Sequence, residues 1–162
     1  MEEMVDIVDE NDNVVGKTTW DEAVKNKLLR RGIRVFILNS KGEMLLQKKS
    51  KKVKINPSLW TSSASGSVTS GEKYEEAAQR ELREEMGIET KLNFLFKIRQ
   101  SDSICAAFEG FYDGKIKPNW ETEDTEFVKI YKIKEDIKNN NRDFTDGFKK
   151  FFKKYLELKG IK

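Results

Sequence analysis

The chain has 162 residues, and its Lys and Arg total of 31 exceeds its Asp and Glu total of 28, for a net charge of +3. This length suits one domain with one core, and so small a charge does not by itself indicate nucleic-acid binding. The absence of histidine from the sequence excludes a Ser-His-Asp triad, a Cys-His pair and a histidine zinc site. Any catalysis must therefore use carboxylates, lysines, hydroxyl groups or a metal ion held by oxygen atoms.

Cysteine usage and hydropathy indicate the compartment. The single cysteine, Cys105, rules out an internal disulfide and lies among apolar residues, which predicts a core position. No apolar run approaches the ~20 residues of a membrane span, and the acidic N-terminus is unlike a signal peptide. We therefore expect a soluble, cytoplasmic protein that does not enter a membrane.

The N-terminal residues predict a β-hairpin over about residues 4–17. Residues 4–8 and 14–17 alternate like short strands, and the polar residues 10–13 between them favour a turn. Such a hairpin would present a strand edge at which two chains could pair, so a homodimer is one expectation.

A short helix and a second hairpin are expected next. Thr19 or Asp21 can cap a helix that extends to Leu29. The β-branched and apolar residues 33–38 and the residues 44–47 predict two strands joined by a tight polar turn.

The second half of the chain is also predicted to mix strands and helices. Residues 92–98 and 104–112 are expected to pair as strands, followed by an acidic loop at 119–126. We expect a strand at 127–133 and one helical turn at 134–138.

Aromatic residues recur at helical spacing near the C-terminus and predict a helix over about residues 144–158. This aromatic stripe is interpreted as core rather than as a base-stacking platform. The predicted architecture is one α+β domain over residues 1–162, with a mixed sheet covered by at least two helices.

Residues 66–88 carry the clearest chemical signal. A glycine-containing turn precedes a helix in which Glu81, Glu84 and Glu85 stand at i, i+3 and i+4, and thus on one face. Like charges on one helical face are unfavourable, and a divalent cation that prefers oxygen ligands, such as Mg²⁺, would reverse that penalty.

This stretch resembles the Nudix box, G-x5-E-x7-R-E-U-x-E-E-x-G-U, in which U is a bulky aliphatic residue. Every fixed position is met, by Gly66, Glu72, Arg80, Glu81, Leu82, Glu84, Glu85, Gly87 and Ile88. The order of the predicted elements is also similar to the Nudix fold. The resemblance implies a mixed β-sheet between helices (α/β/α) over nearly the whole chain.

The resemblance further implies a site for Mg²⁺ or Mn²⁺. Glu84 and Glu85 would be the principal ligands, joined by the Gly66 carbonyl, because glycine permits close backbone approach. Glu81 would be a further ligand or the base that orients water.

Three other positions of the motif are expected to support that site. Arg80, which we group with Glu81 as catalytic, and Glu72 would hold the loop and the helix in register. Gly87 would end the helix in the left-handed conformation.

The sequence upstream of the box resembles the branch of this superfamily that contains type I isopentenyl-diphosphate isomerases. The positions of the isomerase's cysteine, histidines and later glutamate instead hold Ser65, Val24, Arg30, Ser67 and Ser103, with Asp102 beside the last. We therefore reject isomerase activity and retain the structural kinship.

The favoured hypothesis is hydrolysis of a nucleoside diphosphate linked to another group, by attack of water on phosphorus. Lys48 and Lys54, in the basic loop 48–54, are candidate phosphate contacts, although this loop can also be only a solvated surface. Trp60 is interpreted as core in preference to pocket lining. A further acidic residue is expected from Glu121, Glu123, Asp124 or Glu126, and the sequence does not choose among these four.

A different class is a Nudix-fold module that binds a nucleotide or RNA without turnover. The basic loop and the C-terminal lysines would supply its charge. The complete set of metal ligands argues against it, so RNA is the less favoured partner.

Overall fold

The computed structural model describes residues 2–162, and its N-terminal elements match the predicted hairpin. β1 (Met4–Val8) pairs antiparallel with β2 (Val14–Thr19), and β2 forms the edge of the sheet. Thr19 caps the following helix α1 (Trp20–Lys25), because its hydroxyl oxygen accepts a hydrogen bond from the Glu22 amide at 3.2 Å. The helix is shorter than predicted and excludes Leu29, since Lys27 takes a positive φ of 52°.

The central strands β3 (Arg30–Leu38) and β4 (Glu43–Lys49) form a hairpin only at their turn. They pair at Leu38 and Met44, and then diverge. β3 continues in parallel with β8 (Ser103–Phe111) and antiparallel with β6 (Ala64–Ser67).

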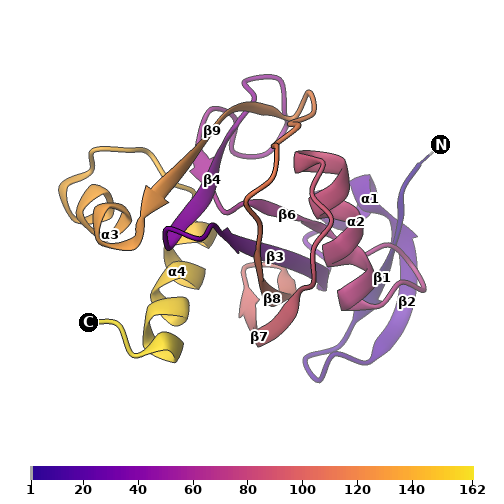
Figure 1. Cartoon of the computed structure of the whole chain (residues 1–162). Helices are drawn as coiled ribbons and strands as arrows, with labels where there is room; N and C mark the ends of the chain where they lie inside the picture. Colours follow the sequence, from indigo (N-terminus) through magenta and orange to yellow (C-terminus); the bar gives the residue numbers. More distant parts are fainter. Residues whose placement is uncertain (1) are drawn as a thin grey trace.

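β4 pairs along its length with other strands, namely β5 (Trp60–Thr61) and β9 (Thr122–Lys129). β7 (Asn93–Gln100) pairs with β8, as expected from the sequence. The nine-stranded sheet is therefore mixed, and its β4–β5–β9 part leaves the β3 part at an angle (Figure 1).

The prediction for residues 119–133 was wrong in its boundaries, whereas the residues 134–138 are helical as expected. The stretch expected to be an acidic loop contains most of β9, and α3 (Ile130–Asn139) begins inside the expected strand. Pairing with β4 along one edge outweighs the poor strand propensity of the acidic residues. In α3 the apolar residues Ile130, Ile133 and Ile137 share one face and pack against the core.

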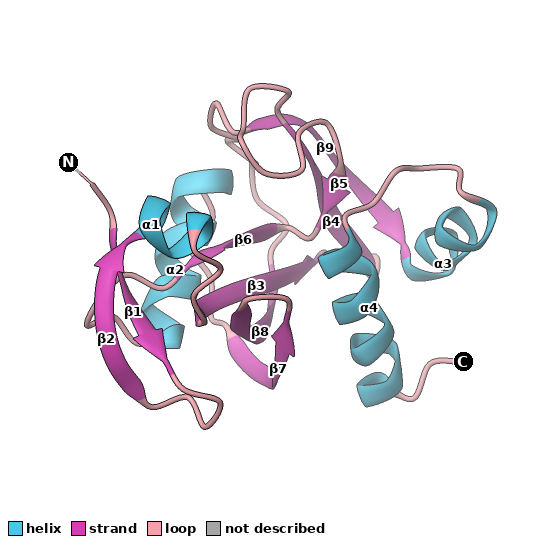
Figure 2. Ribbon diagram, turned by 180° about the vertical axis from the view of Figure 1, so that it is seen from behind, coloured by secondary structure: helices cyan, strands magenta, loops and turns pink. Residues whose placement is uncertain are grey.

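Helices cover both faces of the sheet, which confirms the predicted α/β/α arrangement (Figures 1 and 2). α2 (Tyr74–Met86) packs Leu82 and Met86 against residues of β3 such as Val35. α4 (Asp146–Lys159) packs on the opposite face, together with α3.

The aromatic stripe of α4 is core, as the sequence indicated. Phe148 is fully buried and stacks on Phe144 and Phe152, with ring centroids 4.9 and 5.3 Å away. Cys105 lies in the same core cluster, and burial raises the pKa of its thiol to about 11. None of the helices within residues 2–162 combines the length and the apolar character that membrane crossing requires.

Replacement of Phe148 by alanine should strongly destabilise the protein. Loss of a buried phenyl ring and the resulting cavity typically cost about 3–5 kcal/mol of unfolding free energy. Urea denaturation monitored by circular dichroism measures this change. The control Lys153→Ala removes an exposed side chain of the same helix and should change stability by less than about 0.5 kcal/mol; equal losses in both variants would contradict the core assignment.

Candidate active site

The helix α2 is fixed at both ends by its own sequence. At its start the Lys73 amide donates to the Glu76 carboxylate at 2.9 Å, which satisfies a free amide of the first turn. At its end Gly87 adopts φ 65°, the left-handed conformation expected of this residue. The helix therefore presents its glutamates at a defined rotation.

The Arg80 guanidinium joins the loop before the helix, the helix itself and strand β6. It contacts both carboxylate oxygens of Glu72 at 2.9 and 3.0 Å and donates to the Ser67 carbonyl at 3.0 Å. Its Nη1 also donates to Glu81 at 2.9 Å and to Glu84 at 3.3 Å. Burial alone would raise the pKa of Glu72, but the hydrogen bonds from Arg80 hold this pKa below its ordinary value. Glu72 in turn raises the pKa of Arg80.

Glu85 is a buried residue, 5% exposed, and its carboxylate accepts two hydrogen bonds. Gln47 Nε2 donates to its Oε1 at 2.8 Å, and the Ser65 amide donates to its Oε2 at 3.3 Å. Burial raises the pKa of Glu85 well above its ordinary value, and the neighbouring Glu81 raises it further. A cation beside this carboxylate would compensate the charge that burial disfavours.

Gln47 is a site residue that sequence reasoning missed. Its amide is held in place because Nε2 also donates to the Ser63 carbonyl at 3.1 Å and Oε1 accepts from the Thr122 hydroxyl at 2.8 Å. The available signal was a polar residue that ends the apolar run Met44-Leu45-Leu46.

Glu81 lies directly against Gly66. A Cβ atom added at Gly66 would stand 2.4 Å from the Glu81 carboxyl carbon and 2.5 and 2.8 Å from its oxygens. Only glycine therefore allows this carboxylate to lie on the β6 backbone. Burial raises the pKa of Glu81, although its contacts with Glu85 and Arg80 oppose the rise.

Glu84 differs from its two neighbours because 53% of its side chain is exposed, against 14% for Glu81. Both carboxylates contact Arg80 Nη1, and within residues 2–162 no three acidic or cysteine side chains converge closely enough to form a ready metal-binding group. The donor chemistry nevertheless suits a hard divalent ion. The site offers carboxylate and backbone oxygens, a glycine cradle that a Cβ would fill, and buried charge to neutralise.

Two basic side chains, Lys49 and Arg34, lie near Glu85, but the Arg34 guanidinium is buried on the α4 side of β3, 5.0 Å from the Phe151 ring centroid. Burial lowers the pKa of Lys49, and Glu85 opposes this shift by its proximity. Arg34 donates through Nη1 to Thr61 and Ser62 at 2.9 and 3.0 Å, and Glu85 likewise opposes the burial-induced fall of its pKa.

The two lysines named from the sequence lie elsewhere. Lys48 pairs with Glu123 at 3.2 Å, and Lys54 is exposed and pairs with Asp21 of α1 at 3.7 Å. Adjacent strand residues point to opposite faces, so the choice between Lys48 and Lys49 depends on the orientation of β4.

Among the four late acidic residues, Glu121 is the one placed with the carboxylates of α2. Its charge contributes to the raised pKa of Glu85, and its carbonyl accepts the Ser50 amide at 2.8 Å. Glu123 is occupied by Lys48, while Asp124 and Glu126 line a separate cavity.

Several positions that correspond to isomerase residues do gather in the fold. Gly32 pairs with Ser67 and Cys105, Arg30 pairs with Ser103, and a Cβ at Gly32 would stand 2.9 Å from the Ser103 hydroxyl. Hydroxyl groups thus occupy a place where the resemblance would call for metal-binding and acidic side chains.

Comparison with known proteins gives consistent matches. A NUDIX domain family model matches residues 28–148. An isopentenyl-diphosphate Delta-isomerase 2 from Photorhabdus laumondii is 30% identical, with 93% of this chain and 90% of that protein covered. An uncharacterized Nudix hydrolase from Pseudomonas aeruginosa is 31% identical, with 71% of each chain covered.

Solved structures share the fold. The crystal structure of a Deinococcus radiodurans protein matches with a TM-score of 0.84 and 25% identity, covering 94% of this chain and 98% of that one. The NUDIX domain of Shewanella oneidensis NrtR, complexed with ADP ribose, matches with a TM-score of 0.64 and 12% identity, covering 86% and 98%.

Replacement of Gly66 by alanine should displace the Glu81 carboxylate while the fold survives, because the colliding atoms are the flexible end of a side chain. We expect Mn²⁺ affinity to fall about tenfold or more, as measured by electron paramagnetic resonance titration. The control Gly16→Ala adds a methyl group with no neighbour within 4 Å and should leave affinity unchanged. Unaltered Mn²⁺ binding in Gly66→Ala would show that this close approach has no role in the site.

Proposed function

The chain belongs to the Nudix family, and from this premise we propose that it is a metal-dependent hydrolase of nucleoside diphosphates linked to another group. The observation that carries the proposal is the largely buried pair of carboxylates, Glu81 and Glu85, beside Gly66, with the cation Lys49 near Glu85. A site with oxygen ligands and a neighbouring cation matches a diphosphate bridged to a divalent ion.

The proposed metal ligands are the carboxylates of Glu81, Glu84 and Glu85 with the Gly66 carbonyl. Bound Mg²⁺ or Mn²⁺ would neutralise phosphoryl charge and activate a water molecule. Arg80 holds Glu81 and Glu84 on the exposed side, and Gln47 with the Ser65 amide holds Glu85 on the buried side.

The reaction proceeds by attack of a water oxygen on phosphorus, with cleavage of the bond to the bridging oxygen. Glu81 is the proposed proton acceptor, because it is held at the inner edge of the site by Arg80. Lys49 is the proposed phosphate contact in place of the expected Lys48 and Lys54, and would stabilise the negative charge that develops on the phosphate oxygens. Glu121 is the proposed additional acidic residue.

One observation concerns the substrate. A fold relative binds ADP ribose, which is a nucleoside diphosphate linked to a sugar. This supports the same chemical class for the present chain, with the exact substrate to be found among such compounds.

Isomerisation of isopentenyl diphosphate is the second candidate, because relatives at about 30% identity bear that name. It is disfavoured because Ser65 and Ser103 lack the thiol and carboxylate that a proton-transfer mechanism at those positions would use. A screen with Mg²⁺ and Mn²⁺ that includes isopentenyl diphosphate, sugar nucleotides and capped RNA separates isomerisation, hydrolysis and binding without turnover.

Charge-neutral variants of the proposed ligands test the hydrolase assignment. Glu84→Gln and Glu85→Gln should each lower kcat/KM for ADP ribose, or for the best substrate of the screen, at least about 100-fold. Thermal unfolding verifies that the variants are folded. Glu75→Gln, an exposed position in the first turn of the same helix, is the matched control and should retain full activity. Full metal-dependent hydrolysis by either ligand variant would refute the metal assignment.

The two adjacent lysines of β4 provide an internal comparison. Lys49→Ala should raise KM about tenfold or more, because a charge-assisted contact to phosphate contributes about 1.5–3 kcal/mol. Lys48→Ala removes the same charge on the other face of the strand and should raise KM less than threefold. Steady-state kinetics decide between them, and the reverse order would restore the original choice of Lys48.

A further inference from the structure

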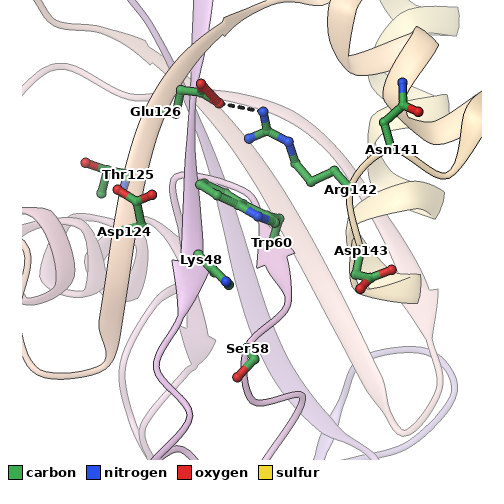
Figure 3. A pocket seen from close by; sticks show the side chains of 9 residues that line it. All are labelled: Lys48, Ser58, Trp60, Asp124, Thr125, Glu126, Asn141, Arg142 and Asp143. Atoms are coloured by element: carbon green, nitrogen blue, oxygen red, sulfur yellow. Dashed lines mark hydrogen bonds and ion pairs between the residues drawn. The ribbon is translucent and has the colours of Figure 1, made fainter.

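A polar cavity of about 470 Å³ lies along the β4–β5–β9 part of the sheet (Figure 3). Its walls include Lys48, Trp60, Asp124, Glu126, Arg142 and Asp143. The strand register explains the placement: Lys48 pairs with both Trp60 and Asp124, so these three point to one face, while the adjacent Gln47 points to Glu85. One layer of the sheet therefore separates the cavity from the carboxylate site.

One wall of the cavity is a stack of flat side chains. The Arg142 guanidinium lies over the Trp60 ring, with its carbon 4.4 Å from the ring centroid. Arg142 is fixed by ion pairs to Glu126 at 2.5 Å and to the buried Asp136 at 3.4 Å. Its Nη1 is buried without a hydrogen-bond partner among residues 2–162.

The position of Trp60 is held by the backbone. Its amide donates to the Asp143 carbonyl at 2.8 Å, and its carbonyl accepts from the Thr145 amide at 3.0 Å. Trp60 and Asp143 are therefore neighbours through their backbones independently of their side-chain rotamers, and both line the cavity (Figure 3).

The unused polar groups of the wall are mainly acceptors. Within the described chain, the Asp143 carboxylate forms no hydrogen bond or ion pair, and Asp124 uses one oxygen to accept the Thr125 amide at 2.8 Å. The cations are already engaged, Lys48 by Glu123 and Arg142 by Glu126. A ligand that fits this wall needs a flat face to stack and N–H groups on its edge.

From this combination we propose that the cavity binds a nucleobase that carries an exocyclic amine: adenine, cytosine or guanine. A base would extend the stack of Trp60 and Arg142, and stacking of this kind contributes about 1–3 kcal/mol, while the Asp143 carboxylate accepts from the amine edge. Uracil, with one edge N–H between two carbonyl oxygens, meets these acceptors less well.

The base belongs either to the substrate or to a separate nucleotide that occupies the cavity alone. Only if the base belongs to the substrate does the inference rest on the proposed hydrolase function. The structure provides a short connection to the carboxylate site, because Thr61, next to Trp60, pairs with Gln47, which donates to Glu85 at 2.8 Å.

Binding of nucleosides without metal or phosphate tests the cavity independently of hydrolysis. Cytidine, guanosine, adenosine and uridine are titrated into the full chain and observed by amide chemical shifts and tryptophan fluorescence. We expect the three amine-bearing nucleosides to bind at least about fivefold more tightly than uridine and to shift the resonances of residues 58–61 and 141–143. Nucleoside binding should persist in Glu85→Gln, so that loss of hydrolysis and loss of base binding are distinguishable.

Two variants locate the binding. Asp143→Asn preserves shape at an exposed position and should weaken binding of the amine-bearing nucleosides about tenfold, while Trp60→Phe weakens all four. Trp120→Phe, at an exposed tryptophan outside the cavity, is the control and should bind normally. Absence of nucleoside binding, equal binding by Asp143→Asn, or preference for the polyamine spermidine would overturn the inference.

Kinetics then assign the source. A rise in KM for the nucleotide substrate in Asp143→Asn, matching the loss of nucleoside affinity, identifies the substrate's own base. An unchanged KM with weakened nucleoside binding identifies a separate nucleotide, and either result supports the base-binding cavity.

Discussion

The arrangement of the carboxylate site depends on the single guanidinium group of Arg80. Its contacts reach the loop before α2, the helix and the end of β6, through Glu72, Glu81, Glu84 and the Ser67 carbonyl. A lysine could not replace it, because a compact ammonium lacks the planar fork that bridges these groups at once. One positive charge among three carboxylates leaves the cluster negative, and Glu85 adds a further buried acid. The geometry is thus held by Arg80, while the remaining charge favours a cation from solution.

What the sequence predicted well is local. The residues of the box lie within 23 positions, so one helix and one turn bring Glu72, Arg80 and Glu81 together, and the absence of a side chain at Gly66 has a direct counterpart in the close approach of Glu81. The aromatic spacing of α4 likewise gave its buried face, because a helix repeats its contacts every turn.

What the sequence left open depends on contacts between distant strands. The sequence alone does not distinguish Lys48 from Lys49. Which of the two faces Glu85 depends on how β4 pairs with β5 and β9, and the register shifts between these two residues. Gln47 could not be recognised for the same reason, since its partner Glu85 lies 38 positions away. The acidic residues of β9 form a strand because β4 offers them a partner, and Trp60 is both packed on the core and exposed to a cavity.

Alkylation of the buried Cys105 thiol can be used to measure local unfolding of the protein. Alkylating reagents attack the thiolate, and a cysteine 7% exposed with a pKa near 11 presents almost none of it at neutral pH. Because the chain has one cysteine, the rate of its modification reports how often the sheet and α4 separate, without an introduced label. A bound cation or nucleotide that stabilises the folded protein would slow this modification. Ligand affinity can therefore be measured by mass spectrometry from the fraction of alkylated protein.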